Sequence, residues 1–387
     1  MASLRVKVNG ALAGALYKEQ GKHFFRYDMA QQLTNFVSLT MPVRRSEYQH
    51  SQLFPIFEMH LPEGYLLALL KRHYAKLVGS DDFNLLGLMA PSIRGRLEYS
   101  AESTPAEPLS LEELVRPQHK DLFQELAERF ALHSPISGVQ PKVLAPVLNK
   151  ATLKLEQYIV KAWGEEYPQL ALNEYWCMRV AQAAGIPVPE FYLSDDKALF
   201  IMKRFDFLPT GEALGFEDFC VLQGKSSEQK YEGTYEQLAK SLLQFLSAQS
   251  KHIAMQYFFK MMVVNQILQN GDAHLKNFGV LYTHQHDVTL APAYDIVSTT
   301  AYIRNDSSAL LMMGSNKWWT KKHLLQFGIH ACQLSAEQAE RSYQECIFGL
   351  QAVHDELQQA IANSKNEDEL MVMQHIYCLI EKELKQQ

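Results

Sequence analysis

The stretch that decides the fold runs over residues 270–279 and reads Asn270-Gly271-Asp272-Ala273-His274-Leu275-Lys276-Asn277-Phe278-Gly279. It crowds amide, carboxylate, imidazole and ammonium groups into a few positions. An apolar stretch over 257–268, interrupted by Lys260, precedes it and is typical of a buried helix. A short strand-like stretch follows it. The pattern predicts a polar loop that joins a buried helix to a strand.

Two spacings in and after this loop point to chemistry. Asp272 and Asn277 stand in the Asp-x-x-x-x-Asn spacing of the protein-kinase catalytic loop, where the Asp receives a hydroxyl proton and the Asn binds Mg²⁺. Further on, Asp295 follows Tyr294 among apolar neighbours. Amide and carboxylate oxygens are ligands that Mg²⁺ prefers. The three positions therefore predict a site for phosphoryl transfer.

Such a site also needs a cation on the phosphates, and Lys161 in the strand-like stretch 158–162 could supply it. A single lysine in a strand more often faces solvent. Only its occurrence together with Asp272, Asn277 and Asp295 favours a contact of Lys161 with phosphate. The segment 134–142 precedes the first strand of the same region and could cover a nucleotide. It contains one glycine, Gly138, so a plain turn is the alternative.

Composition limits the class of protein. The chain has 387 residues, of which 47% are hydrophobic and 21% charged, as in ordinary globular proteins. The net charge of −6 argues against a chain that holds nucleic acid mainly by charge. The five cysteines include no C-x-x-C pair, which favours a reducing compartment. No uncharged apolar stretch is long enough for a membrane span, so we expect a soluble cytoplasmic protein.

The order of elements predicts three regions. Residues 1–30 read as an antiparallel meander with a hairpin at Asn9-Gly10. Helical patterns follow over 52–77 and 81–88, and again over 111–132 beyond a polar stretch. Strand patterns cover 138–148, 158–162, 190–193 and 198–202, with a helix over 173–184. Helices dominate from 235, apart from strand-like pieces near 278–282 and 288–291, and the tail over 336–385 reads as two or three helices.

Taken together, these motifs resemble the HipA family of bacterial toxin kinases, and the resemblance covers nearly the whole chain. It includes the N-terminal meander and helices, the loop over 136–142, the stretches 204–206 and 223–232, the loop over 270–279, and Tyr294-Asp295. It implies an α+β fold, namely a HipA-like bilobal protein-kinase-like fold with a small N-terminal α+β subdomain. The implied domains are 1–105 for the subdomain, 106–225 for the β-rich kinase N-lobe and 226–387 for the helical C-lobe.

The resemblance also implies cofactors and residue roles. The cofactors are ATP and Mg²⁺. Asp272 would be the catalytic base, with His274 and Lys276 beside the transferred phosphate, and Asn277 and Asp295 would bind the metal. The nucleotide-binding positions would be Lys161, Ser137, Gly138, Val139, Gln140, Lys203 and Phe205, with Glu174 as the ion-pair partner of Lys161 or, alternatively, a solvated helix residue.

The same resemblance implies a biological role and two departures from the family pattern. HipA proteins are Ser/Thr protein kinases that pair with a small HipB helix-turn-helix antitoxin. Characterised members arrest growth by phosphorylating aminoacyl-tRNA synthetases or other translation-linked proteins. Many members carry Glu where Lys203 stands. Pro135 replaces a commonly autophosphorylated Ser, so we expect autophosphorylation on Ser137 first, with Ser134 one residue out of register.

Two other functions stay open. The chain could be mainly a co-repressor scaffold that grips a HipB-like dimer on operator DNA, with DNA contacted only through the antitoxin. It could also be a small-molecule phosphotransferase of the aminoglycoside-kinase type, which shares the Asp-x-x-x-x-Asn spacing. The N-terminal unit and the loop over 136–142 argue against this second function. Trp318-Trp319 could form a partner patch, although packed aromatic residues are more common.

Overall fold

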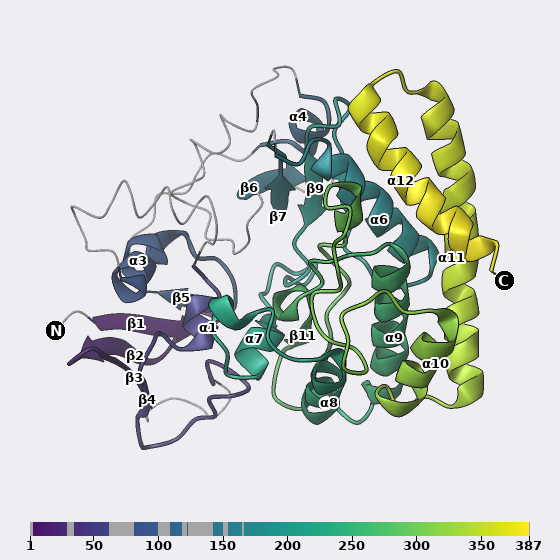
Figure 1. Ribbon diagram of the computed structural model, residues 1–387. Coiled ribbons are helices and arrows are strands. Elements are labelled where there is room, and N and C mark those ends of the chain that lie inside the picture. The colour runs from purple at the N-terminus through teal and green to yellow at the C-terminus, as the bar shows by residue number, and fades with distance from the viewer. Residues whose placement is uncertain are drawn as a thin grey trace. The chain divides into compact units, whose positions relative to one another are not determined.

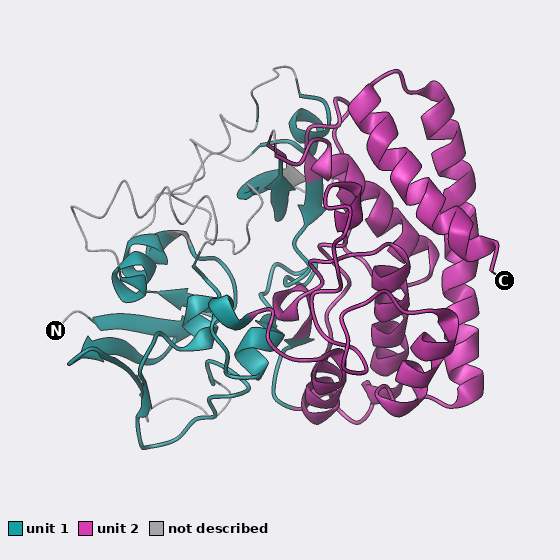
Figure 2. Cartoon of the chain, in the orientation of Figure 1, with its two compact units in different colours: residues 1–162, 201–229, 281–285 teal, residues 163–200, 230–280, 286–387 magenta. Residues whose placement is uncertain are grey.

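The computed structural model describes residues 3–28, 35–61, 81–99, 109–117, 122, 142–149, 154–164 and 166–386. Within them the chain forms two compact units, shown in different colours in Figure 2. Unit 1 contains residues 1–162, 201–229 and 281–285, and unit 2 contains residues 163–200, 230–280 and 286–387. Each unit is described by itself. The domain limits at 105 and 225 stay a prediction.

Unit 1 begins with the predicted meander, and its first turn follows from the sequence. Asn9 and Gly10 both have positive φ, 47° and 80°, as a two-residue hairpin with twisted strands requires. The hairpin joins the first two strands of an antiparallel five-stranded sheet of order β4-β3-β2-β1-β5. These strands are β1 (Ser3–Val8), β2 (Ala11–Glu19), β3 (Lys22–Tyr27), β4 (Tyr48–His50) and β5 (Leu97–Tyr99).

One face of this sheet carries the core of the N-terminal region. Each of the first three strands contributes a fully buried residue to it, namely Val6, Leu16 and Phe25. They pack with residues of α1 (Pro55–Glu58) and of α3 (Asp82–Met89). Because Asp81 accepts the backbone N–H of Asn84, α3 begins at the position that the N-cap pattern predicted. The expected helix over 52–77 is only partly testable, since residues 62–80 lie outside the described part.

The rest of unit 1 supplies the strands predicted for the β-rich region. β6 (Lys142–Asn149) pairs antiparallel with β7 (Lys154–Lys161), and β9 (Phe200–Lys203) is the next neighbour of β7. This order brings Lys161 and Lys203 to adjacent strands. The remaining elements of the unit are η1 (Ala90–Ser92), α4 (Leu111–Val115), β10 (Gly215–Asp218), α7 (Phe219–Leu222) and η3 (Ser227–Gln229).

Unit 2 is mainly helical, as the sequence predicted from residue 235 onward (Figure 1). Its centre is α9, which is apolar on nearly all sides and therefore buried along most of its length. α11 packs against α6, α9, α10 and α12. The elements are α6 (Leu170–Ala183), β8 (Phe191–Leu193), α8 (Tyr235–Phe245), α9 (Lys251–Ile267), η4 (Leu275–Asn277), β12 (Thr289–Leu290), η5 (Thr299–Ala301), α10 (Lys321–His330), α11 (Ala336–Asn363) and α12 (Glu367–Leu384). The strand β11 (Gly279–Tyr282) begins in unit 2, and its last two residues belong to unit 1.

Lys260 is the one charged residue in the apolar stretch of α9, and unit 2 satisfies it internally. Its side chain is buried, and its Nζ donates to the Ala184 carbonyl at 3.0 Å and pairs with the Glu345 carboxylate. A buried ammonium needs such partners because burial without them is costly. Among the described residues, no helix is long and apolar enough to cross a membrane.

The five cysteines divide by exposure. Cys177, Cys220, Cys332 and Cys346 are buried free thiols, whereas Cys378 on α12 is exposed. Burial disfavours the thiolate and raises the pKa of Cys346 to about 12. It raises the pKa of Cys177 and of Cys332 well above the ordinary value. All five cysteines lie in the described part of the chain, and each is a free thiol there.

Candidate active site

The loop over 270–279 leaves α9 through a pair of asparagines. The backbone N–H of Asn270 donates to the Asn265 carbonyl at 2.9 Å, and its side-chain Nδ2 donates to Asn265 Oδ1 at 2.7 Å. Asn270 Oδ1 in turn accepts the backbone N–H of Asp272 at 3.1 Å. Asn270 is only 1% exposed, so this network fixes the start of the loop from within the core.

Gly271 is required at its position by close packing. A Cβ atom there would lie 2.0 Å from a carboxylate oxygen of Asp306 and 2.7 Å from Thr299 Oγ1. The backbone N–H of Gly271 donates to the same Thr299 Oγ1 at 2.8 Å, and that hydroxyl donates to the Asp306 carboxylate. The loop is thus tied to the segment over 299–306, which follows the second carboxylate of the site.

Asp272 reaches the surface, in contrast to its neighbours. Its side chain is 43% exposed, whereas that of His274 is 6% exposed. His274 Nε2 lies 3.8 Å from Asp272 Oδ1, beyond hydrogen-bond distance, and Tyr231 donates its hydroxyl to that same oxygen at 2.6 Å. An exposed carboxylate on a loop that is anchored by hydrogen bonds can accept a proton from an incoming hydroxyl group.

Asn277 and Asp295 line one small cavity, together with Asn265 and Asn270. Asn277 Nδ2 donates to the Asp272 carbonyl at 2.7 Å, which orients the amide, so its oxygen is the atom that could bind a metal. Both residues offer oxygen donors, so the set fits Mg²⁺ better than a softer metal. Among the described residues, no group of three or more His, Cys, Asp or Glu side chains could hold a metal by itself.

The backbone at Asp295 is strained. Its φ is +59°, a left-handed conformation that costs a non-glycine residue about 1 kcal/mol or more. The neighbouring residues hold it in place, because the Ala293 N–H donates to the Pro187 carbonyl at 2.8 Å and the Tyr294 hydroxyl donates to the Lys276 carbonyl at 2.7 Å. Strain of this kind is common at functional sites, where it aims a side chain.

The structure therefore brings Asp272, His274, Lys276, Asn277 and Asp295 together in unit 2. Glu174 also lies in unit 2, in α6, and is fully buried, so the alternative of a solvated helix glutamate is wrong. The site residues Ser134, Ser137, Gly138, Val139 and Gln140, with Pro135, lie outside the described residues.

Unit 1 holds the other nucleotide-binding candidates. Lys161 is 2% exposed at the end of β7, so the alternative of a solvent-facing lysine is wrong. Lys203 on β9 pairs its Nζ with Glu156 Oε1 at 2.6 Å, which neutralises the charge that departs from the family pattern. Phe205 follows β9 and packs edge-on against Phe216, with ring centroids 5.4 Å apart.

Sequence reasoning missed the contact of Tyr231 with Asp272. The stretch 223–232 belonged to the resemblance, but no residue of it was given a role. The Trp318-Trp319 pair is packed rather than free. Trp318 Nε1 donates to the Asp306 carbonyl at 3.1 Å, and the Trp319 ring lies 4.7 Å from that of His323.

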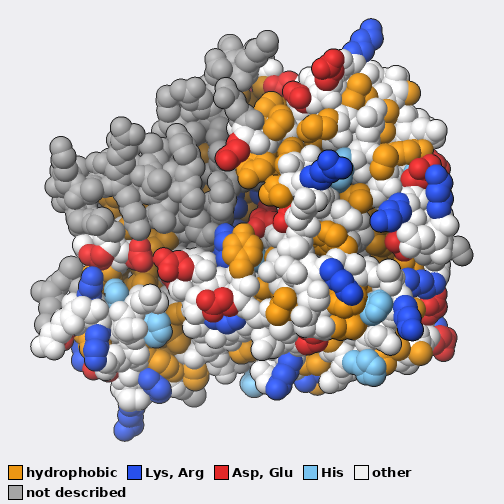
Figure 3. Space-filling model, viewed as in Figure 1, with side chains coloured by type: hydrophobic (Ala, Val, Ile, Leu, Met, Phe, Trp, Pro, Cys, Tyr) orange, Lys and Arg blue, Asp and Glu red, His pale blue; other side chains and the backbone are white. Residues whose placement is uncertain are grey.

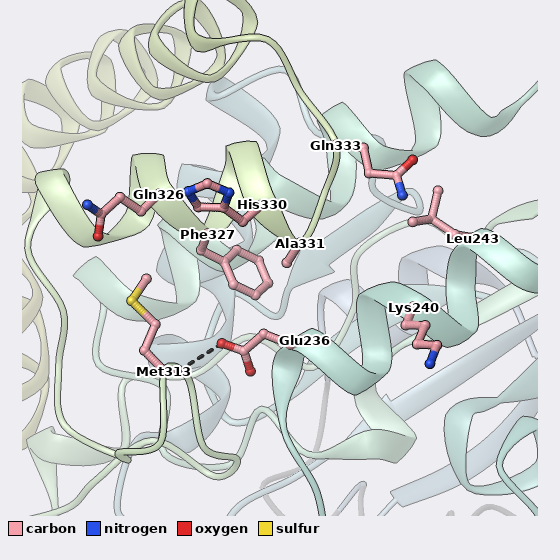
Figure 4. A pocket seen from close by; sticks show the side chains of 9 residues that line it. All are labelled: Glu236, Lys240, Leu243, Met313, Gln326, Phe327, His330, Ala331 and Gln333. Atoms are coloured by element: carbon pink, nitrogen blue, oxygen red, sulfur yellow. Dashed lines mark hydrogen bonds between the residues drawn. The ribbon is translucent and has the colours of Figure 1, made fainter.

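A second cavity in unit 2, of about 680 Å³, contains none of the predicted site residues. Figure 4 shows its walls, which come from α8, from α10 and the residues just after it, and from the turn at Met313. Glu236 on α8 accepts the backbone N–H of Met313 at 2.7 Å, drawn as the dashed line in Figure 4. The lining residues are Glu236, Lys240, Leu243, Met313, Gln326, Phe327, His330, Ala331 and Gln333.

Two family models match the chain. The model of the HipA N-terminal domain matches residues 4–100, and the model of the HipA-like C-terminal domain matches residues 134–354. Among curated proteins, "Putative kinase Y4dM" of Sinorhizobium fredii is 29% identical over 290 residues, 68% of this chain and 66% of that protein. "Putative kinase" of Haemophilus influenzae is 33% identical over 198 residues, which are 46% of this chain and 56% of that protein. The chain thus spans less than two thirds of the length of these two relatives.

Among solved structures, the chain is similar to the one described as "Shewanella oneidensis MR-1 Toxin Antitoxin System HipA, HipB and its operator DNA complex". The TM-score is 0.71 at 19% sequence identity, and the match covers 99% of this chain and 97% of that chain. This likeness confirms the predicted α+β, HipA-like fold class.

Proposed function

Because this chain belongs to the HipA family, we propose that it is an ATP- and Mg²⁺-dependent Ser/Thr protein kinase. One observation carries the proposal. The loop over 270–279 exposes the Asp272 carboxylate while Asn277 and Asp295 line one cavity close behind it. Phosphoryl transfer needs a proton acceptor and oxygen ligands for a metal, and these residues could supply both, which supports the proposal.

The residues have distinct roles in the proposed reaction. Asp272 accepts the proton of the acceptor hydroxyl, and His274 and Lys276 stand beside the transferred phosphate. Asn277 and Asp295 would hold Mg²⁺, which neutralises phosphate charge when bound. Lys161 would contact the phosphates, with Glu174 as its partner, and the backbone over 203–205 would face the adenine. The loop over 137–140 would cover the phosphates, and Ser137, then Ser134, would be the autophosphorylation sites.

We further propose that the chain is the toxin of a type II toxin–antitoxin system. The partner would be a HipB-like helix-turn-helix antitoxin, as in the Shewanella assembly of HipA, HipB and operator DNA. DNA would be contacted only through that antitoxin. In support, acidic and basic side chains are interspersed on the face seen in Figure 3, and the net charge is −6. The proposed substrate is a translation-linked cytoplasmic protein, for example an aminoacyl-tRNA synthetase.

The decisive experiment replaces the proposed base. In Asp272→Ala, phosphate transfer from ATP into lysate proteins should fall by about 10²–10⁴-fold, the usual contribution of a general base, while ATP binding is kept. Asp355→Ala is the matched control, since Asp355 lies on α11 with its side chain 67% exposed and should transfer like wild type. Phosphoproteomics after induction of wild type and Asp272→Ala identifies the substrate.

The same measurement separates the alternatives. Label that appears in small molecules instead of protein would make the chain a small-molecule phosphotransferase. Equal and negligible transfer by wild type and Asp272→Ala, together with tight binding of a HipB-like partner, would leave the co-repressor scaffold.

A further inference from the structure

Tyr231 touches the proposed catalytic base and has no role in the reaction described so far. It stands in Lys230-Tyr231-Glu232, between η3 and α8. Its hydroxyl donates to Asp272 Oδ1 at 2.6 Å, a short bond of the strength expected when the acceptor is ionised. The edge of its ring meets His274, with ring centroids 5.1 Å apart.

The backbone beside Tyr231 is anchored to the same loop. The Leu275 N–H donates to the Lys230 carbonyl at 3.1 Å. Downstream, Thr234 pairs with Leu311 in an isolated parallel bridge and caps α8. The backbone that carries the Tyr231 side chain is therefore held in place relative to Asp272. Both residues of this contact belong to unit 2.

The Tyr231 ring itself is accessible, since the residue is 48% exposed. Exposed side chains change rotamer on the picosecond to nanosecond scale, so a substrate that reaches the ring from solvent can turn it away from the carboxylate. The Tyr231 backbone is thus held in place while its ring is accessible. A side chain that covers Asp272 until a substrate displaces it needs both properties.

A general base must lie within hydrogen-bond distance of the proton that it takes. The Tyr231 hydroxyl already fills this place on Asp272 Oδ1, at the distance that an acceptor hydroxyl would have. We propose that Tyr231 occupies the acceptor position on Asp272 and that a protein substrate displaces it on binding. This inference rests on the proposed kinase function. It deepens that function, since water and weakly bound hydroxyl compounds would have to compete with the Tyr231 hydroxyl for Asp272.

The kinetic test compares full-length wild type with Tyr231→Phe, using Mg²⁺, ATP and a library of Ser- and Thr-centred peptides as the acceptor probe. Phe keeps the ring against His274 and removes only the hydroxyl. The acceptor KM should fall by about three- to tenfold, the worth of one hydrogen bond, while the ATP KM and kcat stay unchanged. Tyr377→Phe is the matched control, since Tyr377 stacks on His354 on α11 and should behave like wild type.

Two kinetic results would overturn the inference. An unchanged acceptor KM would mean that the phenol does not compete with the acceptor. A fall in kcat would mean that Tyr231 positions the base instead of covering it. If neither wild type nor Tyr231→Phe transfers phosphate, both the proposed kinase function and this inference are refuted. If Tyr231→Phe transfers phosphate and wild type does not, both are supported.

A chemical test of the contact needs no catalysis. Tetranitromethane nitrates tyrosine through its phenolate form, and in wild type the Tyr231 hydroxyl is engaged with Asp272. Peptide mapping should therefore find several-fold more nitration of Tyr231 in Asp272→Ala than in wild type, with Tyr377 unchanged. Equal nitration of Tyr231 in both proteins would refute the contact on which the inference depends.

Discussion

Glu217 is the residue of unit 1 at which charge and burial conflict most directly. It is fully buried in β10 and accepts hydrogen bonds from the Tyr282 hydroxyl at 2.5 Å and from the Leu39 N–H at 2.8 Å. A third bond comes from the Ser38 hydroxyl. The guanidinium of Arg96 also favours the carboxylate, but desolvation outweighs these effects and raises the pKa of Glu217 above its ordinary value of 4.5.

This shift predicts how stability depends on pH. Above its ordinary pKa the unfolded chain releases the proton of Glu217 while the folded chain keeps it, so the free energy of unfolding falls as pH rises through the folded-state pKa. Glu217→Gln should remove this part of the pH dependence, measured by urea unfolding at a series of pH values. Glu212→Gln, at an exposed position of unit 1, should keep the wild-type slope. A wild-type slope in Glu217→Gln would contradict the prediction.

At the scale of elements, α8 connects the loop over 270–279 to the segment over 308–315. Tyr235 donates its hydroxyl to the Ala273 carbonyl at 2.9 Å and its backbone N–H to the Leu311 carbonyl at 2.9 Å. The helix begins with a capping box, in which Thr234 Oγ1 accepts the Gln237 N–H and the Gln237 side chain accepts the Thr234 N–H. The start of α8 should therefore affect both stability and catalysis.

Thr234→Ala should lower the free energy of unfolding by about 1 kcal/mol and also reduce the rate of phosphate transfer. Ser335→Ala removes the same kind of cap from α11 and should cost a similar free energy with no loss of transfer. Urea denaturation and the lysate transfer assay measure the two effects. Equal transfer rates in the two variants would contradict the link between α8 and the loop.

Elements with strong local signals were predictable from the sequence. The Asn9-Gly10 hairpin and the helix start at Asp81 are confirmed, because turn chemistry and capping act over a few residues. The helix predicted over 173–184 is confirmed as α6 and ends before Gly185, whose φ is +70°. β10 was not predicted, since its buried Glu217 is stabilised by residues distant in sequence.

The candidate site likewise contains residues that the sequence could predict and residues that it could not. The spacing of Asp272 and Asn277 was visible because both lie in one loop, and Asp295 follows soon after it. Tyr231 and Asp306 could not be found by spacing, since only the fold brings them to Asp272 and Gly271. Residues that act through tertiary contacts leave no local pattern.

For the whole molecule, the proposed ligands should stabilise the fold by mass action. Mg²⁺ with ATP at about 100 times the dissociation constant should add about 2.7 kcal/mol to the free energy of unfolding and raise the melting temperature. EDTA should remove most of this gain, and Asp295→Ala should lose the Mg²⁺-dependent part. Differential scanning calorimetry measures the effect. An equal gain in Asp295→Ala would mean that Asp295 is not a metal ligand.

The division of the cysteines has a practical consequence for spectroscopy. Thiol-reactive dyes attack accessible thiolates, and burial protects the sulfur atoms of Cys177, Cys220, Cys332 and Cys346. Cys378, on the last helix, is the one exposed cysteine among the five. A maleimide fluorophore can therefore be attached at that position in the unmodified chain, and partner binding can be followed by fluorescence anisotropy without first building a cysteine-free background.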